Sequence, residues 1–195
     1  FYIITFVFLM SCTNRQDFDN SQKYYFEGLK RLTMLDSLKN VNYEKARESF
    51  GKALEIYPKH YEAAYWKAFC ELYSKKYTEA IKTSEQYIKL MDESHINKPD
   101  LFVVEGIAEL KIGNINQSNE SFDKAKKIYE KKISKDAYDK NSLLNYSLIL
   151  CYQDRKVDAI SFLEKHKSKI IMNESFNEII DGIRRFDAEK FLKEK

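Results

Sequence analysis

Two stretches of the chain repeat one short pattern at a distance of 34 residues. Each stretch ends in an alanine, Ala46 or Ala80, and each has a tyrosine three positions earlier, Tyr43 or Tyr77. A period of 34 residues is typical of proteins built from stacked helical hairpins. Such proteins usually present a curved surface to another molecule. The spacing therefore predicts an all-α solenoid that holds a partner, and it leaves the partner unidentified.

The composition supports a helical fold and argues against nucleic-acid binding. The 195 residues include 5 Gly and 2 Pro, which is few for a sheet-rich fold with many tight turns. Lys and Arg number 33 against 30 Asp and Glu, so the formal net charge is only +3. A nucleic-acid-binding protein concentrates positive charge on one surface, whereas the basic pairs of this chain are interrupted by acids. We expect no nucleic-acid partner.

The first 11 residues of the chain are uncharged and are followed by Cys12. This segment is too short to span a bilayer, which takes about 20 apolar residues, but it suits the apolar region of an export signal. Leu9-Met10-Ser11-Cys12 also resembles a bacterial lipobox. The resemblance implies that residues 1–11 are cleaved and that Cys12 becomes a lipidated N-terminus. A hydrophobic N-terminal helix packed on the repeats is the alternative.

The remainder of the chain shows helical periodicity after a polar linker at residues 13–21. Apolar residues recur at three- and four-residue steps throughout residues 22–195, which we interpret as one helical repeat domain. About four hairpins and a capping helix account for it. The predicted helices are 22–38, 43–57, 60–74, 78–91, 100–112, 115–134, 140–153, 157–167 and 173–194. The cap carries Phe176, Ile179, Ile180, Ile183 and Phe186 on one face.

The positions of the small residues resemble the tetratricopeptide repeat (TPR) family over residues 24–168. This family places small residues where two helices cross, because an interaxial distance of about 8–10 Å leaves no room for large side chains. Repeat by repeat, the matching positions are Ala46, Phe50, Ala53 and Pro58; Ala64, Ala68 and Ala80; Gly106, Gly113, Ser118, Phe122 and Ala125; and Ser147, Ala159 and Leu163. The second repeat departs at Ser84, Tyr87 and Asp92. The later periods are 38 and 41 residues, so the spacing is not strict.

No motif of the sequence indicates catalysis, a cofactor or a metal. The histidines His60, His95 and His166 lie far apart, without carboxylates at metal-ligand spacing. No glycine-rich phosphate loop or nucleophile elbow occurs. Cys70 and Cys151 lie within apolar helical patterns, so we expect both to be buried and unpaired. We expect this chain not to be an enzyme.

The TPR resemblance implies that the first helix of each repeat lines a concave groove for a protein or peptide. Tyr65, Phe69 and Tyr73 recur at four-residue steps and therefore share one helix face. The family's charged clamp for C-terminal carboxylates is not present as a group. The groove residues that the resemblance implies are Glu62, Tyr65, Trp66, Phe69, Tyr73, Lys111, Asn141 and Tyr152.

Together these features predict a lipid-anchored adaptor of the bacterial cell envelope. Thr13 replaces the Asp that signals inner-membrane retention in enteric bacteria, so the outer membrane is favoured. One alternative is a glycan- or small-ligand-binding component that uses the tyrosine-rich face. Another is a self-associating solenoid in which Ile179, Ile183 and Phe186 form an open end.

Overall fold

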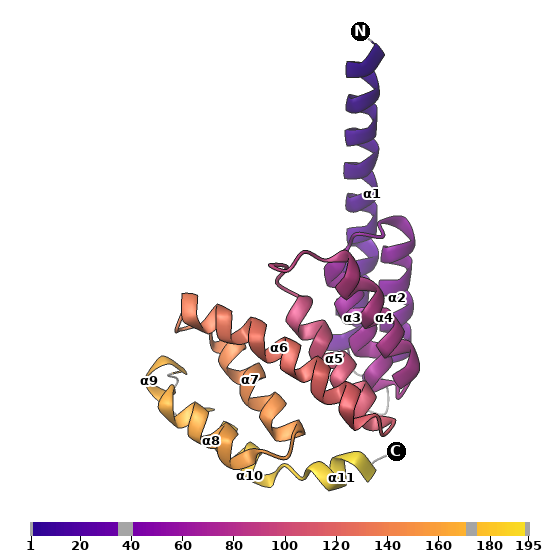
Figure 1. Cartoon of the computed structure of the whole chain (residues 1–195). Coiled ribbons are helices and arrows are strands. Elements are labelled where there is room, and N and C mark those ends of the chain that lie inside the picture. The colour runs from indigo at the N-terminus through magenta and orange to yellow at the C-terminus, as the bar shows by residue number, and fades with distance from the viewer. Residues whose placement is uncertain (1, 35–40, 171–174, 194–195) are drawn as a thin grey trace. The chain divides into compact units, whose positions relative to one another are not determined.

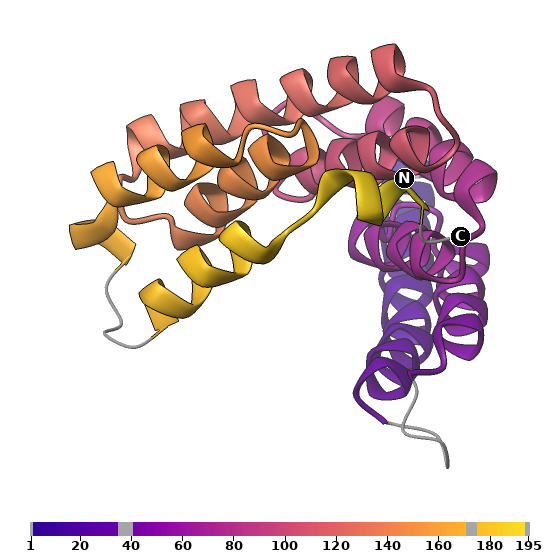
Figure 2. The same ribbon diagram turned by 90° about the horizontal axis from the view of Figure 1, so that it is seen from below.

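The computed structural model describes residues 2–34, 41–170 and 175–193, with the side chains from Arg15 onward apart from Ser175 (Figure 1). The chain divides into two compact units, Phe1–Asn97 and Lys98–Lys195. Within each unit, consecutive helices pack against one another as hairpins (Figure 2). The predicted all-α helical repeat fold is confirmed.

The described residues of unit 1 form α1 (Tyr2–Thr33), α2 (Tyr43–Ile56), α3 (Tyr61–Tyr73) and α4 (Tyr77–Leu90). Its core is formed by the small and aromatic positions of the repeat pattern. Ala46, Phe50, Ala64, Ala68 and Ala80 are all fully buried. The first part of α1, drawn in indigo, projects beyond the ends of α2, α3 and α4 (Figure 1).

Residues 13–21 are helical, which corrects the prediction of a polar linker. They belong to α1, which contains no Gly or Pro before Gly28 and so has no residue that would end the helix early. Phe18 packs against Tyr57 and His60 with ring centroids 5.4 and 5.5 Å apart, and Ser21 is fully buried. The predicted end of this helix at residue 38 lies outside the described residues.

Unit 2 contains α5 (Lys98–Lys111), α6 (Ile115–Lys135), α7 (Lys140–Tyr152), α8 (Lys156–Lys165), α9 (Lys167–Ile170), α10 (Ser175–Arg185) and α11 (Ala188–Lys193). Phe176, Ile180 and Ile183 of α10 are buried in a cluster with Leu143 of α7 and Leu163 of α8. The apolar face of α10 therefore covers the last hairpin, as a cap does.

The C-terminal stretch forms two helices where the sequence predicted a single helix over 173–194. Phe186 and Asp187 separate α10 from α11. The Asp187 Oδ1 atom accepts a hydrogen bond of 2.9 Å from the Lys190 amide, which caps a new helix start. An Asp side chain that caps one helix competes with continuation of the preceding one, which accounts for the break. Residues 173, 174 and 194 lie outside the described part.

Both units contain the same tight helix crossing, in which a glycine faces a phenylalanine. A Cβ atom added to Gly28 would lie 2.6 Å from Phe50 Cε1, and one added to Gly106 would lie 2.6 Å from Phe122 Cε1. Phe50 and Phe122 are fully buried, so their rings have little freedom to move aside. Glycine is therefore required at both crossings by close approach.

In the second and fourth repeats, residues of other sizes occupy the two positions that hold glycine and phenylalanine at the crossings described above. The second repeat has Ala68 and Ser84 where its neighbours have Gly and Phe, and both are fully buried. The fourth has Ser147 and Leu163, also buried. In the fourth repeat the larger residue on the first helix accompanies a smaller one on the second, which keeps the total side-chain volume at the crossing similar. In the second repeat both residues are small, so the two side chains at this crossing occupy less volume than Gly and Phe do.

A left-handed residue ends the first helix of three hairpins. Lys75, Gly113 and Asp154 have φ values of 61°, 88° and 57°. The residue after each donates an amide hydrogen bond of 2.8–2.9 Å to a carbonyl five positions earlier, the pattern of a Schellman motif. Each left-handed residue also lies five positions before the small residue that opens the second helix. The irregular spacing therefore arises elsewhere, mainly because α6 has 21 residues and α4 has 14.

Candidate functional site

Tyr65, Phe69 and Tyr73 lie on one face of α3 in unit 1, as predicted. We call these three residues the α3 aromatic face. The ring centroids of Phe69 and Tyr73 are 4.4 Å apart, and those of Tyr65 and Phe69 are 6.2 Å apart. Tyr73 stacks on Tyr43 of α2 at 5.2 Å and is still 52% exposed. Tyr43 was not predicted to be part of this face, although it belongs to the repeated pattern.

Trp66 lies beneath this face and holds α3 against the other helices of unit 1. Its ring stacks on Phe50 of α2 at 6.4 Å and meets Phe69 edge-on at 5.3 Å. A side-chain hydrogen bond links Trp66 to Tyr25 of α1, whose pKa is raised by burial in spite of that bond. Trp66 therefore supports the surface from below.

Glu62 lies one turn before the aromatic residues, at the exposed start of α3. Its Oε2 atom is 3.4 Å from Nδ1 of the buried His60, and the same nitrogen is 3.4 Å from the Ala63 amide. The Ala63 amide donates to this nitrogen, which caps the start of α3. Hydrogen bonding with His60 lowers the pKa of Glu62. Glu62 thus adds negative charge beside the α3 aromatic face.

In unit 2 the structure brings together two of the predicted groove residues, Lys111 and Tyr152. Both contact Phe191 of α11: Lys111 Nζ is 3.8 Å from the centroid of its ring, and the Tyr152 ring is 5.1 Å away. Asn141 is exposed at the opposite end of α7 from Tyr152, about 16 Å along the helix axis at 1.5 Å per residue. Asn141 is not part of this cluster.

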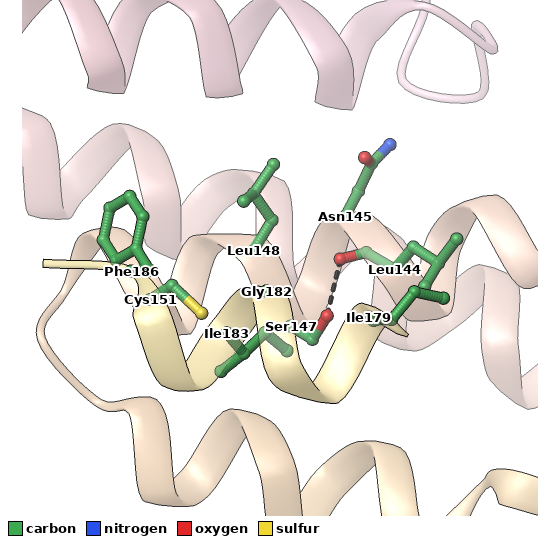
Figure 3. Close-up of a pocket in the computed structure, with 9 residues that line it drawn as sticks. All are labelled: Leu144, Asn145, Ser147, Leu148, Cys151, Ile179, Gly182, Ile183 and Phe186. Atoms are coloured by element: carbon green, nitrogen blue, oxygen red, sulfur yellow. Dashed lines mark hydrogen bonds between the residues drawn. The ribbon is translucent and has the colours of Figure 1, made fainter. Parts of the chain in front are cut away.

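A cavity of about 290 Å³ lies between α7 and α10 (Figure 3). Its walls are almost entirely apolar. The hydroxyl of Ser147 donates to the Leu144 carbonyl at 2.7 Å. The side chains of Asn145 and Ile183 point in opposite directions (Figure 3). The cavity therefore offers shape and apolar contact without a reactive group. It is lined by Leu144, Asn145, Ser147, Leu148, Cys151, Ile179, Gly182, Ile183 and Phe186.

A polar network that no sequence pattern indicated connects α5, α6 and α7. The hydroxyl of Tyr129 donates to Asp100 Oδ1, and the amide of Asn145 donates to the same oxygen at 3.2 Å. Burial raises the pKa of Asp100 even though the bond from Tyr129 opposes that effect. These bonds join three helices of unit 2, so we assign the network to the packing of that unit.

Neither cysteine outside the N-terminal segment has the properties of a reactive group. Cys70 and Cys151 are buried and unpaired, as predicted. Burial raises the pKa of Cys70 to about 12 and that of Cys151 to about 11, so both remain thiols near neutral pH. Among the described side chains, no group of His, Cys, Asp and Glu is arranged to hold a metal ion. In the described residues, no helix combines the length and apolar character needed to cross a membrane.

Comparison with known proteins supports the fold. No family model matches the chain, and no curated protein matches it. Among solved structures, it is similar to the crystal structure of a thermophilic TPR protein of Thermus thermophilus. The TM-score is 0.64 at 13% sequence identity, over 88% of this chain and 86% of that chain. The chain therefore has a TPR-like helical repeat fold.

Proposed function

We propose that the chain is a TPR-like adaptor, anchored in the bacterial cell envelope, that binds a protein or peptide partner through the α3 aromatic face. The observation that carries this proposal is the half-open ring cluster of unit 1. Tyr73 is held by Tyr43 and Phe69 and still exposes 52% of its surface. Rigid aromatic rings with one polar end are efficient anchors for a partner, because little conformational entropy is lost when they bind.

The arrangement of the rings favours a peptide over a glycan. Sugar binding by stacking requires ring faces that are exposed together. In the α3 aromatic face the rings lie at 36–45° to one another, and Tyr73 already stacks on Tyr43. The rings therefore do not form one flat stacking surface, and the tyrosines add hydroxyl groups, a combination that suits the side chains and backbone of a peptide. The neighbouring carboxylate of Glu62 favours a peptide that carries a positive charge.

The membrane anchor is the second part of the proposal, and it rests on the lipobox-like Leu9-Met10-Ser11-Cys12. The side chain of Cys12 is not among those described. Lipidation at Cys12 would tether the repeats to a bacterial membrane, with the outer membrane favoured by Thr13. Metabolic labelling with a clickable fatty acid tests this: the expected label is lost in Cys12→Ser. A wild type that is exported and takes up no label rejects the anchor.

The partner is tested by crosslinking the tagged protein in native cell envelopes, followed by mass spectrometry. The test variant is Tyr65→Ala/Tyr73→Ala, which leaves Trp66 and Phe69 in place to support α3. Tyr138→Ala is the matched control, because Tyr138 is a 69% exposed tyrosine in the loop between α6 and α7. We expect a protein that is captured by the wild type and the control and is lost by the double variant.

A captured protein is accepted as a partner only if, once purified, it binds the purified wild type. The double variant is expected to weaken this binding about tenfold or more, since loss of an aromatic anchor typically costs at least about 1 kcal/mol. Circular dichroism establishes that the variant is folded. Equal capture by the wild type and the folded double variant rejects the α3 aromatic face as the binding surface.

A further inference from the structure

The last helix of the chain lies on the surface of unit 2 that contains the predicted groove residues Lys111 and Tyr152. Tyr152 meets three phenylalanine rings: it stacks on Phe122 at 5.9 Å, and it contacts Phe186 at 5.5 Å and Phe191 at 5.1 Å. Phe186 and Phe191 are themselves 5.9 Å apart. The C-terminal segment thus inserts two rings, five positions apart in sequence, around one tyrosine.

Two lysines complete this contact by binding backbone carbonyls of the segment. The Lys156 ammonium donates to the Phe186 carbonyl at 2.9 Å, and the Lys111 ammonium donates to the Phe191 carbonyl. Phe186 follows the last residue of α10, and Phe191 lies in the last turn of α11, where carbonyls lack partners within the helix. A cation at a helix C-terminus is also favoured by the helix dipole. We call Lys111, Phe122, Tyr152 and Lys156 the α11-binding surface.

The segment that occupies this surface depends on it for its structure. α11 has six residues, far fewer than the roughly 12–15 that an isolated helix needs in water. None of its side chains is fully buried. Because α11 has few buried contacts, its local opening requires less free energy than unfolding of the whole unit. The segment can therefore leave the surface while the hairpins of unit 2 remain folded.

We propose that the α11-binding surface is a peptide-binding site and that residues 186–193 are its resident, intramolecular ligand. The site recognises a short helical segment with two aromatic residues five positions apart, through rings around Tyr152 and carbonyls on Lys111 and Lys156. A partner segment of this chemistry binds by displacing α11. The inference deepens the proposed adaptor function, because it adds a second, self-occupied site with a stated ligand class.

The experiment supplies the resident segment in trans. A fluorescein-labelled peptide of residues 183–193 is titrated, with anisotropy as the readout, into the full-length wild type and into Phe191→Ala. Phe191→Ala removes the ring that holds α11 and leaves the α11-binding surface itself unchanged. We expect the variant to bind the peptide at least tenfold more tightly than the wild type, whose own segment competes. A peptide with Phe191 replaced by Ala is expected not to bind.

Three further variants separate displacement from a general effect on folding. Asp187→Ala removes the N-cap of α11 without altering the surface, so it is also expected to increase peptide binding. Lys190→Ala changes an exposed residue of the same helix and is expected to behave as the wild type. Adding Lys111→Ala to Phe191→Ala is expected to weaken peptide binding severalfold. Hydrogen exchange should show lost protection in α11 with α5 to α7 retained.

Several outcomes overturn the inference. Equal binding by the wild type and a folded Phe191→Ala variant removes the competition on which it rests. Absence of binding to both Phe191→Ala and Asp187→Ala removes the site. Sedimentation of the wild type as a dimer that Phe191→Ala dissociates rejects an intramolecular ligand. Because the assay needs no cellular partner, its result is independent of the crosslinking test on unit 1.

Discussion

Units 1 and 2 share one scaffold and differ in what covers the first helices of their hairpins. Each contains a glycine pressed against a buried phenylalanine, Gly28 with Phe50 and Gly106 with Phe122. In unit 1 the aromatic residues of α3 reach a half-open surface at Tyr73. In unit 2 the corresponding ends of α5 and α7 hold the chain's own α11 through Phe191. Shared packing positions therefore specify the hairpins, while residues outside them decide which surface is available.

The largest expected effect comes from breaking the shared crossing. Gly28→Ala and Gly106→Ala each place a methyl group about 2.6 Å from a buried ring. We expect each to reduce the free energy of unfolding by about 1–3 kcal/mol, the usual cost of overpacking a core. Chemical denaturation measures the change, with fluorescence of Trp66 reporting on unit 1 and hydrogen exchange of α5 and α6 reporting on unit 2.

Each unit offers a matched control for this substitution. A Cβ atom on Gly51 in unit 1, or on Gly182 in unit 2, would meet no atom within 4 Å. Both lie inside helices, α2 and α10, so Ala should leave stability unchanged or raise it by up to about 1 kcal/mol. A loss of stability at Gly51 or Gly182 equal to that at Gly28 or Gly106 would contradict the assignment of the crossing.

A smaller effect tests whether the hairpin turn is also shared between the units. Lys75 of unit 1 and Gly113 of unit 2 occupy the same left-handed position. Gly113→Ala is expected to cost about 1 kcal/mol, and Lys75→Gly to gain up to about 1 kcal/mol, since a side chain is disfavoured there. Asp154→Gly should gain less, because Asp tolerates this conformation better than Lys. Denaturant titrations that show the same sign for Gly113→Ala and Lys75→Gly would reject a common turn.

The smallest effects concern two acids whose pKa values move in opposite directions. Hydrogen bonds from Arg47 and Lys76 lower the pKa of Glu44 in unit 1 to about 2, and burial raises that of Asp100 in unit 2. Ionised Glu44 therefore stabilises the fold above pH 4.5, and this contribution is lost as the pH falls toward 2. Ionised Asp100 destabilises the fold above its raised pKa, and protonation relieves this as the pH falls.

Unfolding measured between about pH 2 and pH 7 distinguishes the two acids. Glu44→Gln should make the acid loss of stability between pH 4.5 and about 2 shallower, with only a small effect at neutral pH because Glu44 is well exposed. Asp100→Asn should increase stability at neutral pH and abolish the gain on acidification. If both variants shift the pH profile in the same direction, the electrostatic contrast between the units is wrong.

Most of the helices could be predicted because local signals set them. The small residues Ala46, Ala80, Ser118 and Ala159 indicate where the second helix of each hairpin begins. This signal holds even though the distance between successive small residues is not constant. The helix at residues 13–21 could not be predicted, because most residues of this stretch are polar. The ring contacts of its one aromatic residue, Phe18, are with Tyr57 and His60, about 40 positions away. The break at Asp187 was missed for a similar reason: an isolated Asp within an amphipathic pattern is compatible with a continuous helix.

The candidate surfaces were predicted less completely than the helices. The four-residue spacing of Tyr65, Phe69 and Tyr73 correctly placed them on one face of α3. Lys111 and Tyr152 were selected by analogy between repeats, and nothing in their own spacing indicated Phe191 as a common contact. Their meeting depends on where the chain turns after α10, which involves residues 80 and 39 positions distant from Lys111 and Tyr152.

By itself, the sequence determined the class of fold and the side chains available for binding, because helical periodicity and small residues at crossings act over a few turns of chain. Tertiary structure alone decided which of those side chains are accessible. Tyr73 stays 52% exposed at the surface although its ring stacks on Tyr43 and packs against Phe69. Tyr152 is covered because a break at Asp187 directs Phe191 onto it. Such long-range contacts depend on the path of the chain through space, which no local pattern encodes.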